Sequence, residues 1–312
     1  MQEILTRVEK RLYKHLIRSY EKINFSQKIL LEELYEARTI IEKEHQSLFI
    51  EELNDFINKV RIFGFHFATL DIRQDSRVHH KAFTQIVTDL LATSDTTFPK
   101  NYHSLSEEEQ IEVLSLVKGN IDPSILSDEM SVSTIESIYA LKTIQQRNGE
   151  RGANRYIISN NQSALNVMQT FAMLNLCGFE NELPVDIIPL FETVDDLENA
   201  SNVMRILYSN HAYRYHLTKR KNKQTVMLGF SDGTKDGGYL MANWGIFKAK
   251  EALTKISREF DVEVIFFDGR GGPPARGGGK THQFYASLGP TIEDKEIQLT
   301  IQGQTISSNF GT

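Results

Sequence analysis

The chain has 312 residues, of which 40% are hydrophobic and 24% are charged, a composition that is ordinary for a folded globular protein of one large domain or two. The formal net charge of −6 argues against a nucleic-acid-binding surface, although a local basic cluster can still bind a small anion. The single cysteine, Cys177, excludes an internal disulfide and a cysteine-rich metal site, and it favours a reducing compartment, the cytoplasm. No apolar run reaches membrane-spanning length.

The first part of the chain predicts helices. In residues 2–60, apolar side chains recur three and four residues apart with charges between them, which is typical of helices that bury one face. We therefore expect a helical segment over residues 1–62. Residues 63–312 are expected to form a partial barrel of strands and helices, with a polar, largely helical insertion over about 93–150.

The first strand is expected within residues 63–72, where aromatic and β-branched residues dominate. Arg73 would then lie at the carboxyl end of this strand, and Ser76 would cap the helix that follows it. Two roles stay open for Arg73. It either binds an anion at the strand end or forms a structural ion pair with Asp71 or Asp75.

Further apolar runs predict four more strands, over residues 156–160, 185–191, 224–230 and 262–267. Helices are predicted after the first three of these, and such alternation is typical of parallel strands covered by helices. The helix after the third is expected to bury a stripe made of Leu240, Trp244, Phe247, Leu253, Ile256 and Phe260. Polar or charged residues follow the strands, at the edge where barrels and doubly wound sheets bind their ligands.

Five strands are too few to close an eight-stranded barrel. A strand-like run over residues 300–308 lies close to the end of the chain. We therefore expect an α/β fold with an incomplete barrel, in a chain that is a shortened piece of a longer protein.

A glycine-rich stretch, residues 269–279, comes directly after the last of these strands and contains six glycines with Arg270 and Arg276. Glycines let a backbone approach a ligand closely and expose amide donors, and guanidinium groups suit phosphate and carboxylate oxygens. The alternative is a solvated turn without a ligand, but paired arginines after a buried strand favour an anion site. An ATP-binding P-loop is disfavoured, because the glycine it requires is replaced by Pro274.

Carboxylates follow two separate predicted strands, at Glu192 and Asp232. Two hard oxygen ligands, with water and substrate in the other positions, describe a Mg²⁺ or Mn²⁺ site, whereas the alternative is that each carboxylate caps the next helix. Asp195 and Asp196 are better caps than ligands, since they lie where a helix begins. Lys235 lies in a glycine-rich turn beside Asp232 and is either a surface lysine or a ligand for a substrate anion.

The histidines show no spacing that is typical of metal ligands, so structural roles are expected for His66, His79, His80 and His282. Cys177 lies in an apolar helical segment and is expected to be a core residue.

Five ordered blocks of the sequence resemble the phosphoenolpyruvate carboxylase family. They are residues 70–76 (LDIRQDS), 189–197 (PLFETVDDL), 227–238 (MLGFSDGTKDGG), 269–272 (GRGG) and 276–282 (RGGGKTH). The resemblance implies an eight-stranded α/β barrel of the TIM type with many additional helices, usually in a homotetramer. It implies the carboxylation of phosphoenolpyruvate with bicarbonate to oxaloacetate and phosphate, a reaction that fixes carbon dioxide and replenishes the tricarboxylic acid cycle. The cofactor would be Mg²⁺ or Mn²⁺, and acidic metabolites would act as feedback effectors.

The matching blocks also imply roles for single residues. The metal ligands would be Glu192 and Asp232. Catalytic roles would fall to Lys235, Arg270 and Arg276, and substrate binding to Arg73, Arg270, Gly271, Gly272 and Arg276.

The chain departs from the family pattern at Asp268, where the family usually has a histidine. A carboxylate cannot replace an imidazole in proton transfer at neutral pH without a large pKa shift, so we expect Asp268 to be a charge partner of Arg270 or Arg276. The family's amino-terminal block with its catalytic histidine is absent, as are its carboxyl-terminal arginines. The chain alone is therefore expected to be an inactive fragment. The alternative is a non-catalytic barrel protein that binds or senses an anion.

Overall fold

The computed structural model describes residues 1–17, 24–93, 96–179, 183–229, 231–269 and 280–300. The chain divides into two compact units, one of Met1–Leu70 with Ala140–Asn154 and one of Asp71–Tyr139 with Arg155–Thr312. Each unit contains a hydrophobic cluster of its own. The domain boundaries expected from the sequence stay a prediction.

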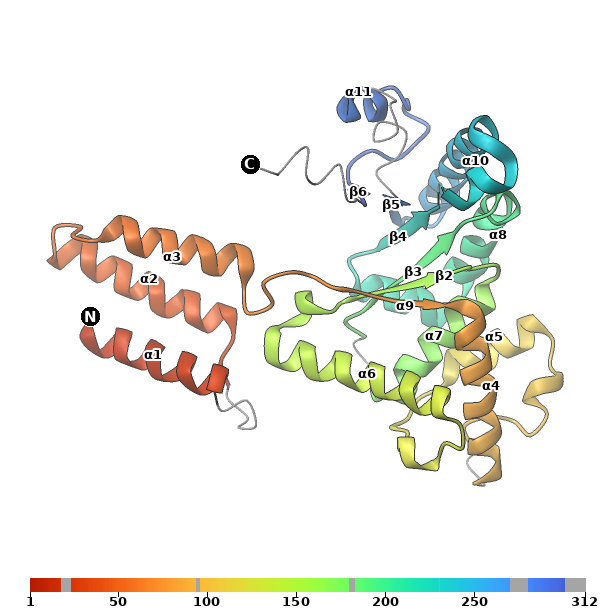
Figure 1. Ribbon diagram of the computed structural model, residues 1–312, viewed down its shortest axis with the longest axis horizontal. Helices are drawn as coiled ribbons and strands as arrows, with labels where there is room; N and C mark the ends of the chain where they lie inside the picture. Colours follow the sequence, from red (N-terminus) through yellow and green to blue (C-terminus); the bar gives the residue numbers. More distant parts are fainter. Residues whose placement is uncertain (18–23, 94–95, 180–182, 230, 270–279, 301–312) are drawn as a thin grey trace. The chain divides into compact units, whose positions relative to one another are not determined.

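Three helices begin the first unit, as the apolar spacing predicts: α1 (Gln2–Ile17), α2 (Gln27–Glu44) and α3 (Ile50–Phe63) (Figure 1). Their apolar faces meet in a core of Ile4, Val8, Phe25, Leu30, Leu34, Ala37, Ile57 and Val60. Glu33 is buried beside this core, and its carboxylate accepts hydrogen bonds from Arg7 at 2.6 Å and Arg11 at 2.5 Å. The two guanidinium groups therefore offset the cost of burying this charge.

The prediction of a strand within residues 63–72 is mostly wrong, because strand β1 spans Asp71–Asp75. Gly64 and Phe67 have φ angles of 54° and 59°, in the left-handed region that interrupts an extended backbone. The rings of Phe63 and Phe67 stack with their centres 5.3 Å apart, so the aromatic residues that predicted a strand pack locally in a turn. Arg73 is consequently the middle residue of β1 and not its carboxyl end.

Within the described residues, six strands form one parallel sheet in the order β1-β2-β3-β4-β5-β6. The other five are β2 (Arg155–Ser159), β3 (Asp186–Phe191), β4 (Lys223–Leu228), β5 (Glu263–Asp268) and β6 (Ile297–Leu299). The predicted fold class, an α/β fold with an incomplete barrel, is confirmed. Strand β6 was not predicted, and the strand expected over 300–308 lies, except for Thr300, outside the described residues.

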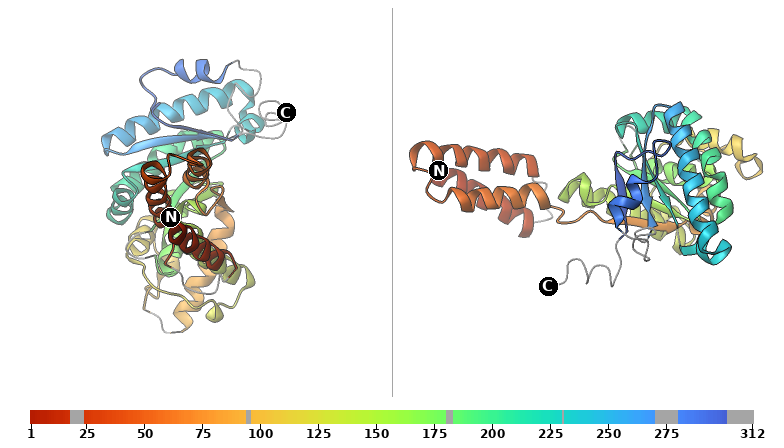
Figure 2. Two further views of the ribbon diagram at one scale, coloured as in Figure 1. Left: turned by 90° about the vertical axis from the view of Figure 1, so that its left-hand side faces the viewer. Right: turned by 90° about the horizontal axis from the view of Figure 1, so that it is seen from above.

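Helices follow the strands of the second unit. They are α4 (Ser76–Ala92), α5 (Glu107–Leu116), α7 (Ala164–Leu176), α8 (Val194–Ser209), α9 (His211–Lys219), α10 (Ser231–Glu259) and α11 (Thr281–Ala286). Of these, α4, α7, α8, α9 and α10 pack on the sheet. Helix α6 spans Glu129–Asn148, and short 3₁₀ turns lie at Tyr102–Ser104, Pro123–Ile125 and Glu150–Gly152. Helices α8 and α10 run side by side (Figures 1 and 2). None of the helices in the described ranges is long and apolar enough to cross a membrane.

Apolar side chains from four neighbouring strands pack together on the sheet, as the predicted buried strands require. They are Ile157, Ile188, Leu190, Met227 and Phe267. Cys177 is also fully buried, as expected of a core residue.

The buried stripe predicted for α10 is right only in its second half. Leu253 and Ile256 are buried, whereas Leu240 and Trp244 are 81% and 56% exposed. Small residues take the buried positions in the first half, namely Ala242, Gly245 and Ala249. Gly245 lies against Leu197 of α8, so the small side chains let the two helices approach closely and leave the large ones in solvent.

Candidate active site

The carboxyl ends of the parallel strands meet at one edge of the sheet, and polar residues lie along it. Asp75 ends β1, Asn160 follows β2, Glu192 follows β3, and Asp268 ends β5. Backbone pairing aligns Asp75 with Ser159 and Leu228 with Asp268, so these residues are neighbours in space. We call this set of strand ends the carboxyl edge. It is the edge at which parallel α/β folds bind ligands.

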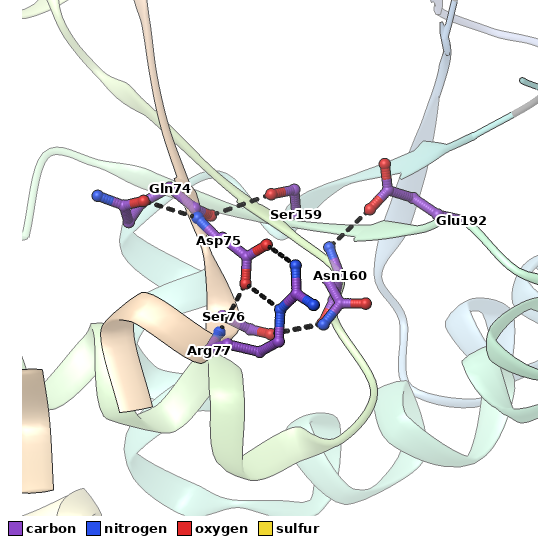
Figure 3. Close-up of polar contacts among 7 residues, drawn as sticks. All are labelled: Gln74, Asp75, Ser76, Arg77, Ser159, Asn160 and Glu192. Carbon is purple, nitrogen blue, oxygen red and sulfur yellow. Dashed lines mark hydrogen bonds and ion pairs between the residues drawn. The ribbon is translucent and has the colours of Figure 1, made fainter. Parts of the chain in front are cut away.

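Asp75, and not Ser76, caps helix α4. Its carboxylate accepts the backbone N–H of Arg77 at 2.8 Å and also holds the Arg77 guanidinium, with Nη2 2.6 Å from Oδ2 (Figure 3). Hydrogen bonding by Arg77 holds the pKa of Asp75 below its ordinary value. Ser76 serves the edge differently, because its hydroxyl donates to the backbone carbonyl of Asn160 at 2.5 Å and so joins the ends of β1 and β2.

Glu192 is held in place by the end of the neighbouring strand. Its Oε2 accepts the backbone N–H of Asn160 at 2.7 Å (Figure 3), and its side chain is half-buried. It does not cap the next helix, since α8 is capped by a box in which Thr193 and Asp196 exchange hydrogen bonds. The prediction that Asp196 is a cap is therefore confirmed. The alternative that Glu192 caps the next helix is excluded.

Gly229 brings the end of β4 directly against Glu192. Its backbone N–H donates to the carbonyl of Phe191 at 2.8 Å, and an added Cβ would stand 3.1 Å from both Cα and Cγ of Glu192. Nearby, an added Cβ on Gly237 would stand 3.1 Å from Cγ2 of Val194, so the first turns of α10 pack on the start of α8. Only a residue without a side chain fits at Gly229 without moving Glu192.

We expect replacement of Gly229 by alanine to lower the free energy of unfolding by about 1–3 kcal/mol, because the new methyl group overpacks the contact with Glu192. Urea unfolding followed by circular dichroism measures this change. Gly245→Ala is the matched control, since the nearest side-chain atom to its added Cβ is 3.6 Å away and alanine is the better helix former. Equal stabilities for the two variants would contradict the close approach at Gly229.

Helix α10 carries the two residues of the third sequence block, Asp232 and Lys235. The backbone from Ser231 is helical, so Lys235 lies in a helical turn and not in the tight glycine-rich turn that the sequence predicted. Its side chain is exposed, and the side chain of Asp232 lies outside the described residues. The helical piece ends at Gly238, whose φ of 79° and ψ of 171° separate it from the rest of α10.

Asp268 has partners other than the arginines expected from the sequence. Its carboxylate is buried, and Oδ2 lies 2.8 Å from Nζ of Lys250 and 2.5 Å from the hydroxyl of Tyr285. The expected partners, Arg270 and Arg276, lie outside the described residues, as do Gly271 and Gly272. The position of Lys250 on the buried face of α10, three residues before Leu253, was the signal in the sequence that the prediction missed.

Arg73 lies on β1 with an exposed side chain, 3.4 Å from the carboxylate of Asp71. This contact is the structural pairing that the sequence left open. In the same part of the sheet, Arg155 also contacts Asp71 at 3.4 Å and lies over the ring of Phe267. Arg77, which the sequence did not single out, is the arginine drawn at the carboxyl edge in Figure 3.

A carboxylate at this edge has the chemistry of a ligand for a hard divalent cation. Among the residues that the structure describes, no group of three or more His, Cys, Asp and Glu side chains gathers in the manner of a metal site. Glu192 nevertheless suits such an ion, because its oxygen is oriented by a backbone hydrogen bond, as ligands of metals commonly are. Mg²⁺ needs only one or two protein carboxylates, with water and substrate completing its shell.

Comparison with known proteins places the chain in a family. The family model described as phosphoenolpyruvate carboxylase matches residues 2–312. The chain belongs to the phosphoenolpyruvate carboxylase family. A phosphoenolpyruvate carboxylase from Nitrosomonas eutropha is 36% identical over 279 residues, which cover 86% of this chain and 29% of that relative.

Membership of the phosphoenolpyruvate carboxylase family confirms the resemblance found in the five sequence blocks. The chain spans less than a third of the length of its carboxylase relative. The family assignment covers both units, because the matched residues include the helices α1–α3 as well as the sheet.

Proposed function

We propose that the carboxyl edge is part of a site that carboxylates phosphoenolpyruvate with bicarbonate, giving oxaloacetate and phosphate. The observation that carries the proposal is the contact between Glu192, after β3, and Gly229, at the end of β4 and three residues before Asp232. Two carboxylates that follow adjacent strands can share one cation. The match of the chain to a family of carboxylases supports the same reaction.

In this proposal Glu192 and Asp232 hold Mg²⁺ or Mn²⁺. The bound ion would supply positive charge to the oxygens of the transferring phosphoryl group and to the enolate left behind. The backbone N–H of Asn160 fixes one oxygen of Glu192, so the carboxylate is oriented before any ion binds.

Cationic side chains are proposed to hold the oxygens of the substrates. Lys235 would hold bicarbonate, and its exposed position on the first turns of α10 leaves it within the reach of solvent. Arg73, Arg270 and Arg276 would bind phosphate and carboxylate oxygens, with the backbone at Gly271 and Gly272 beside them. For Arg73 this role competes with the ion pair to Asp71, an exposed contact of little energetic weight.

We further propose that this chain does not turn over by itself and that it acts in the cytoplasm. The described residues contribute six parallel strands, fewer than the eight of a closed barrel, and the complete family protein is proposed to be a homotetramer that responds to acidic effectors. In that protein the described edge would supply metal and substrate ligands, and other segments would complete the site.

Calorimetric titration of the chain with phosphoenolpyruvate tests the proposal. We expect binding in the presence of Mg²⁺ and at least about tenfold weaker binding after the metal is removed with EDTA, because the bound ion would supply positive charge to the anion. An assay that couples oxaloacetate to the oxidation of NADH should detect no bicarbonate-dependent turnover.

Binding that is equally tight without metal would contradict the metal site and would favour a non-catalytic protein that senses an anion. Sustained bicarbonate-dependent turnover would contradict the proposed inactivity of the isolated chain. The two measurements thus test different parts of the proposal.

A further inference from the structure

Buried Lys250 and Asp268 form a cluster with half-buried Tyr285 at the end of β5. The Lys250 and Asp268 side chains are only 3% and 6% exposed, and their charged atoms lie 2.8 Å apart. The hydroxyl of Tyr285 donates to the same carboxylate oxygen, Oδ2, at 2.5 Å. One oxygen of Asp268 therefore receives a charged and a neutral donor together, and we call these three residues the Asp268 cluster.

The cluster joins three elements that are distant in the sequence. Lys250 comes from the middle of α10, Asp268 ends β5, and Tyr285 belongs to α11, which begins after residue 280. The backbone carbonyl of Asp268 also accepts a hydrogen bond from the N–H of Thr300 at 3.1 Å. The end of β5 is thereby fixed by its side chain and by its backbone.

The position held in this way is part of the carboxyl edge and adjoins the end of β4. Asp268 pairs with Leu228 of β4, and an added Cβ on Gly269 would stand 3.1 Å from the carbonyl oxygen of Leu228 and 3.8 Å from Cα of Gly229. Gly229 in turn contacts Glu192. A short chain of close backbone contacts therefore runs from the Asp268 cluster to Glu192.

Burying two charges is costly, and simple packing does not require it. An ion pair taken from water pays a desolvation penalty that a hydrophobic pair of similar size avoids. Lys250 gains some compensation from the rings of Phe266 and Tyr285, whose centres lie 5.4 and 5.3 Å from Nζ. No donor among the described residues reaches the second oxygen of Asp268, Oδ1. The fold bears this desolvation cost, which indicates that the end of β5 must be held in a defined position. Charged hydrogen bonds fix the direction between two groups, whereas apolar contacts do not.

Proton transfer is a poor alternative role for the cluster. Burial and the neighbouring carboxylate raise the pKa of Tyr285 far above its ordinary value, so its hydroxyl stays a donor. Lys250 and Asp268 are both shielded from solvent within the described residues, and each is already engaged in a short ion pair.

We propose that Asp268 is a positioning residue. Its ion pair with Lys250 and its hydrogen bond from Tyr285 fix the end of β5 against β4, and this sets the position of Gly229 beside Glu192. The consequence for binding of phosphoenolpyruvate rests on the function proposed above. The locking of the strand ends does not.

Variants of the full chain test the proposal by hydrogen exchange with mass spectrometry. In Lys250→Gln and in Asp268→Asn one buried charge loses its partner, and we expect amides at the ends of β4 and β5 to exchange at least about tenfold faster. The double variant with both changes removes both charges and restores a neutral hydrogen-bonded pair. We expect it to recover most of the protection that either single change loses.

Two further variants separate positioning from general stability. Lys248→Gln breaks a surface ion pair with Glu251 on the same helix and should leave exchange at the strand ends unchanged. Tyr285→Phe removes only the hydroxyl. It should lower the urea midpoint less than Lys250→Gln does, since Lys250 still pairs with Asp268, while weakening metal-dependent binding of phosphoenolpyruvate by about threefold to tenfold.

Unchanged exchange at the ends of β4 and β5 in both single variants would overturn the proposal. So would equal acceleration in β1 and β2, since that result describes a cluster that stabilises the whole sheet and positions no part of it. If the unmodified chain fails to bind phosphoenolpyruvate, the proposed function fails, and the exchange measurements still decide whether Asp268 locks the strand ends.

Discussion

Replacement of Glu192 by glutamine is expected to lower the affinity of the chain for Mn²⁺ by at least about a hundredfold, since loss of a direct ligand should exceed the effect of losing a residue that only orients one. The variant keeps the shape of the side chain. Its amide oxygen can still accept the N–H of Asn160, so the carboxyl edge should stay folded. Electron paramagnetic resonance of free Mn²⁺ measures the affinity directly, and calorimetry with phosphoenolpyruvate measures its effect on substrate binding.

Asp195→Asn is the matched control for this experiment. Asp195 lies three residues along the chain, is exposed, and belongs to the first turn of α8, where its charge interacts with the helix dipole. We expect its loss to change Mn²⁺ affinity by less than about twofold, because a solvated charge near the site adds little through water. A larger loss of Mn²⁺ affinity in Asp195→Asn than in Glu192→Gln would show that Glu192 is not the metal ligand. It would remove the main support for the proposed site.

Acid is expected to destabilise the second unit through His79. Its ring is buried, with Nδ1 3.0 Å from the hydroxyl of Thr170 and Nε2 2.8 Å from the hydroxyl of Tyr156, and burial lowers its pKa to about 4. Above pH 6.5 the ring is neutral in both the folded and the unfolded chain. As the pH falls from 6.5 towards 4, the unfolded chain binds a proton and the folded chain does not, so up to about 3 kcal/mol of stability is lost.

His79→Gln should flatten this dependence, because an amide can bond to both hydroxyls and does not titrate. Urea unfolding at several pH values between 4 and 7 measures the slope. His216 is also buried and has a pKa lowered to about 3 by burial, so part of the slope should persist in the variant. Replacement of the exposed His211 by glutamine is the control, and an identical slope in His79→Gln and His211→Gln would show that His79 does not contribute.

The sequence predicted the second unit well where hydrophobic periodicity was unambiguous. Strands β2 to β5 are apolar on both faces, and each was found within two residues of its predicted limits. Such strands are buried on both sides, so few other structures suit them. A structural role for His79 was expected on other grounds, because the histidines lack metal-ligand spacing, and the buried ring bonded to Thr170 and Tyr156 fits it.

Prediction failed where a local backbone preference decided the structure. The aromatic residues around Phe67 suit a strand by composition, but left-handed turns at Gly64 and Phe67 keep them out of the sheet. In α10 the large residues Leu240 and Trp244 suggested a buried face, whereas the close approach to α8 selected alanine and glycine instead. Steric fit between two elements is not visible in the pattern of one of them.

The position of Glu192 at a strand end was predicted, because strand ends can be located from the sequence, whereas its role in a site stays a prediction. Glu192 was placed after β3, and its alternative role as a cap could be discarded only when the hydrogen bonds of Thr193 and Asp196 were known. The partners of Asp268 were not predicted, because Lys250 and Tyr285 are brought to it by tertiary packing across 18 and 17 residues. The roles of Arg270 and Arg276 remain predictions.

The charged residues on β1 affect which polypeptide chains can associate with this edge of the sheet. Among the strands that the structure describes, β1 pairs with β2 alone, so the other side of its backbone is available for pairing with an extended peptide. Asp71, Arg73 and Asp75 alternate along it. An apolar peptide added at this edge would desolvate the ion pairs that Asp71 and Asp75 form, a cost that a polar strand avoids. The charged residues of β1 are thus of the kind that disfavours edge-to-edge association with apolar strands.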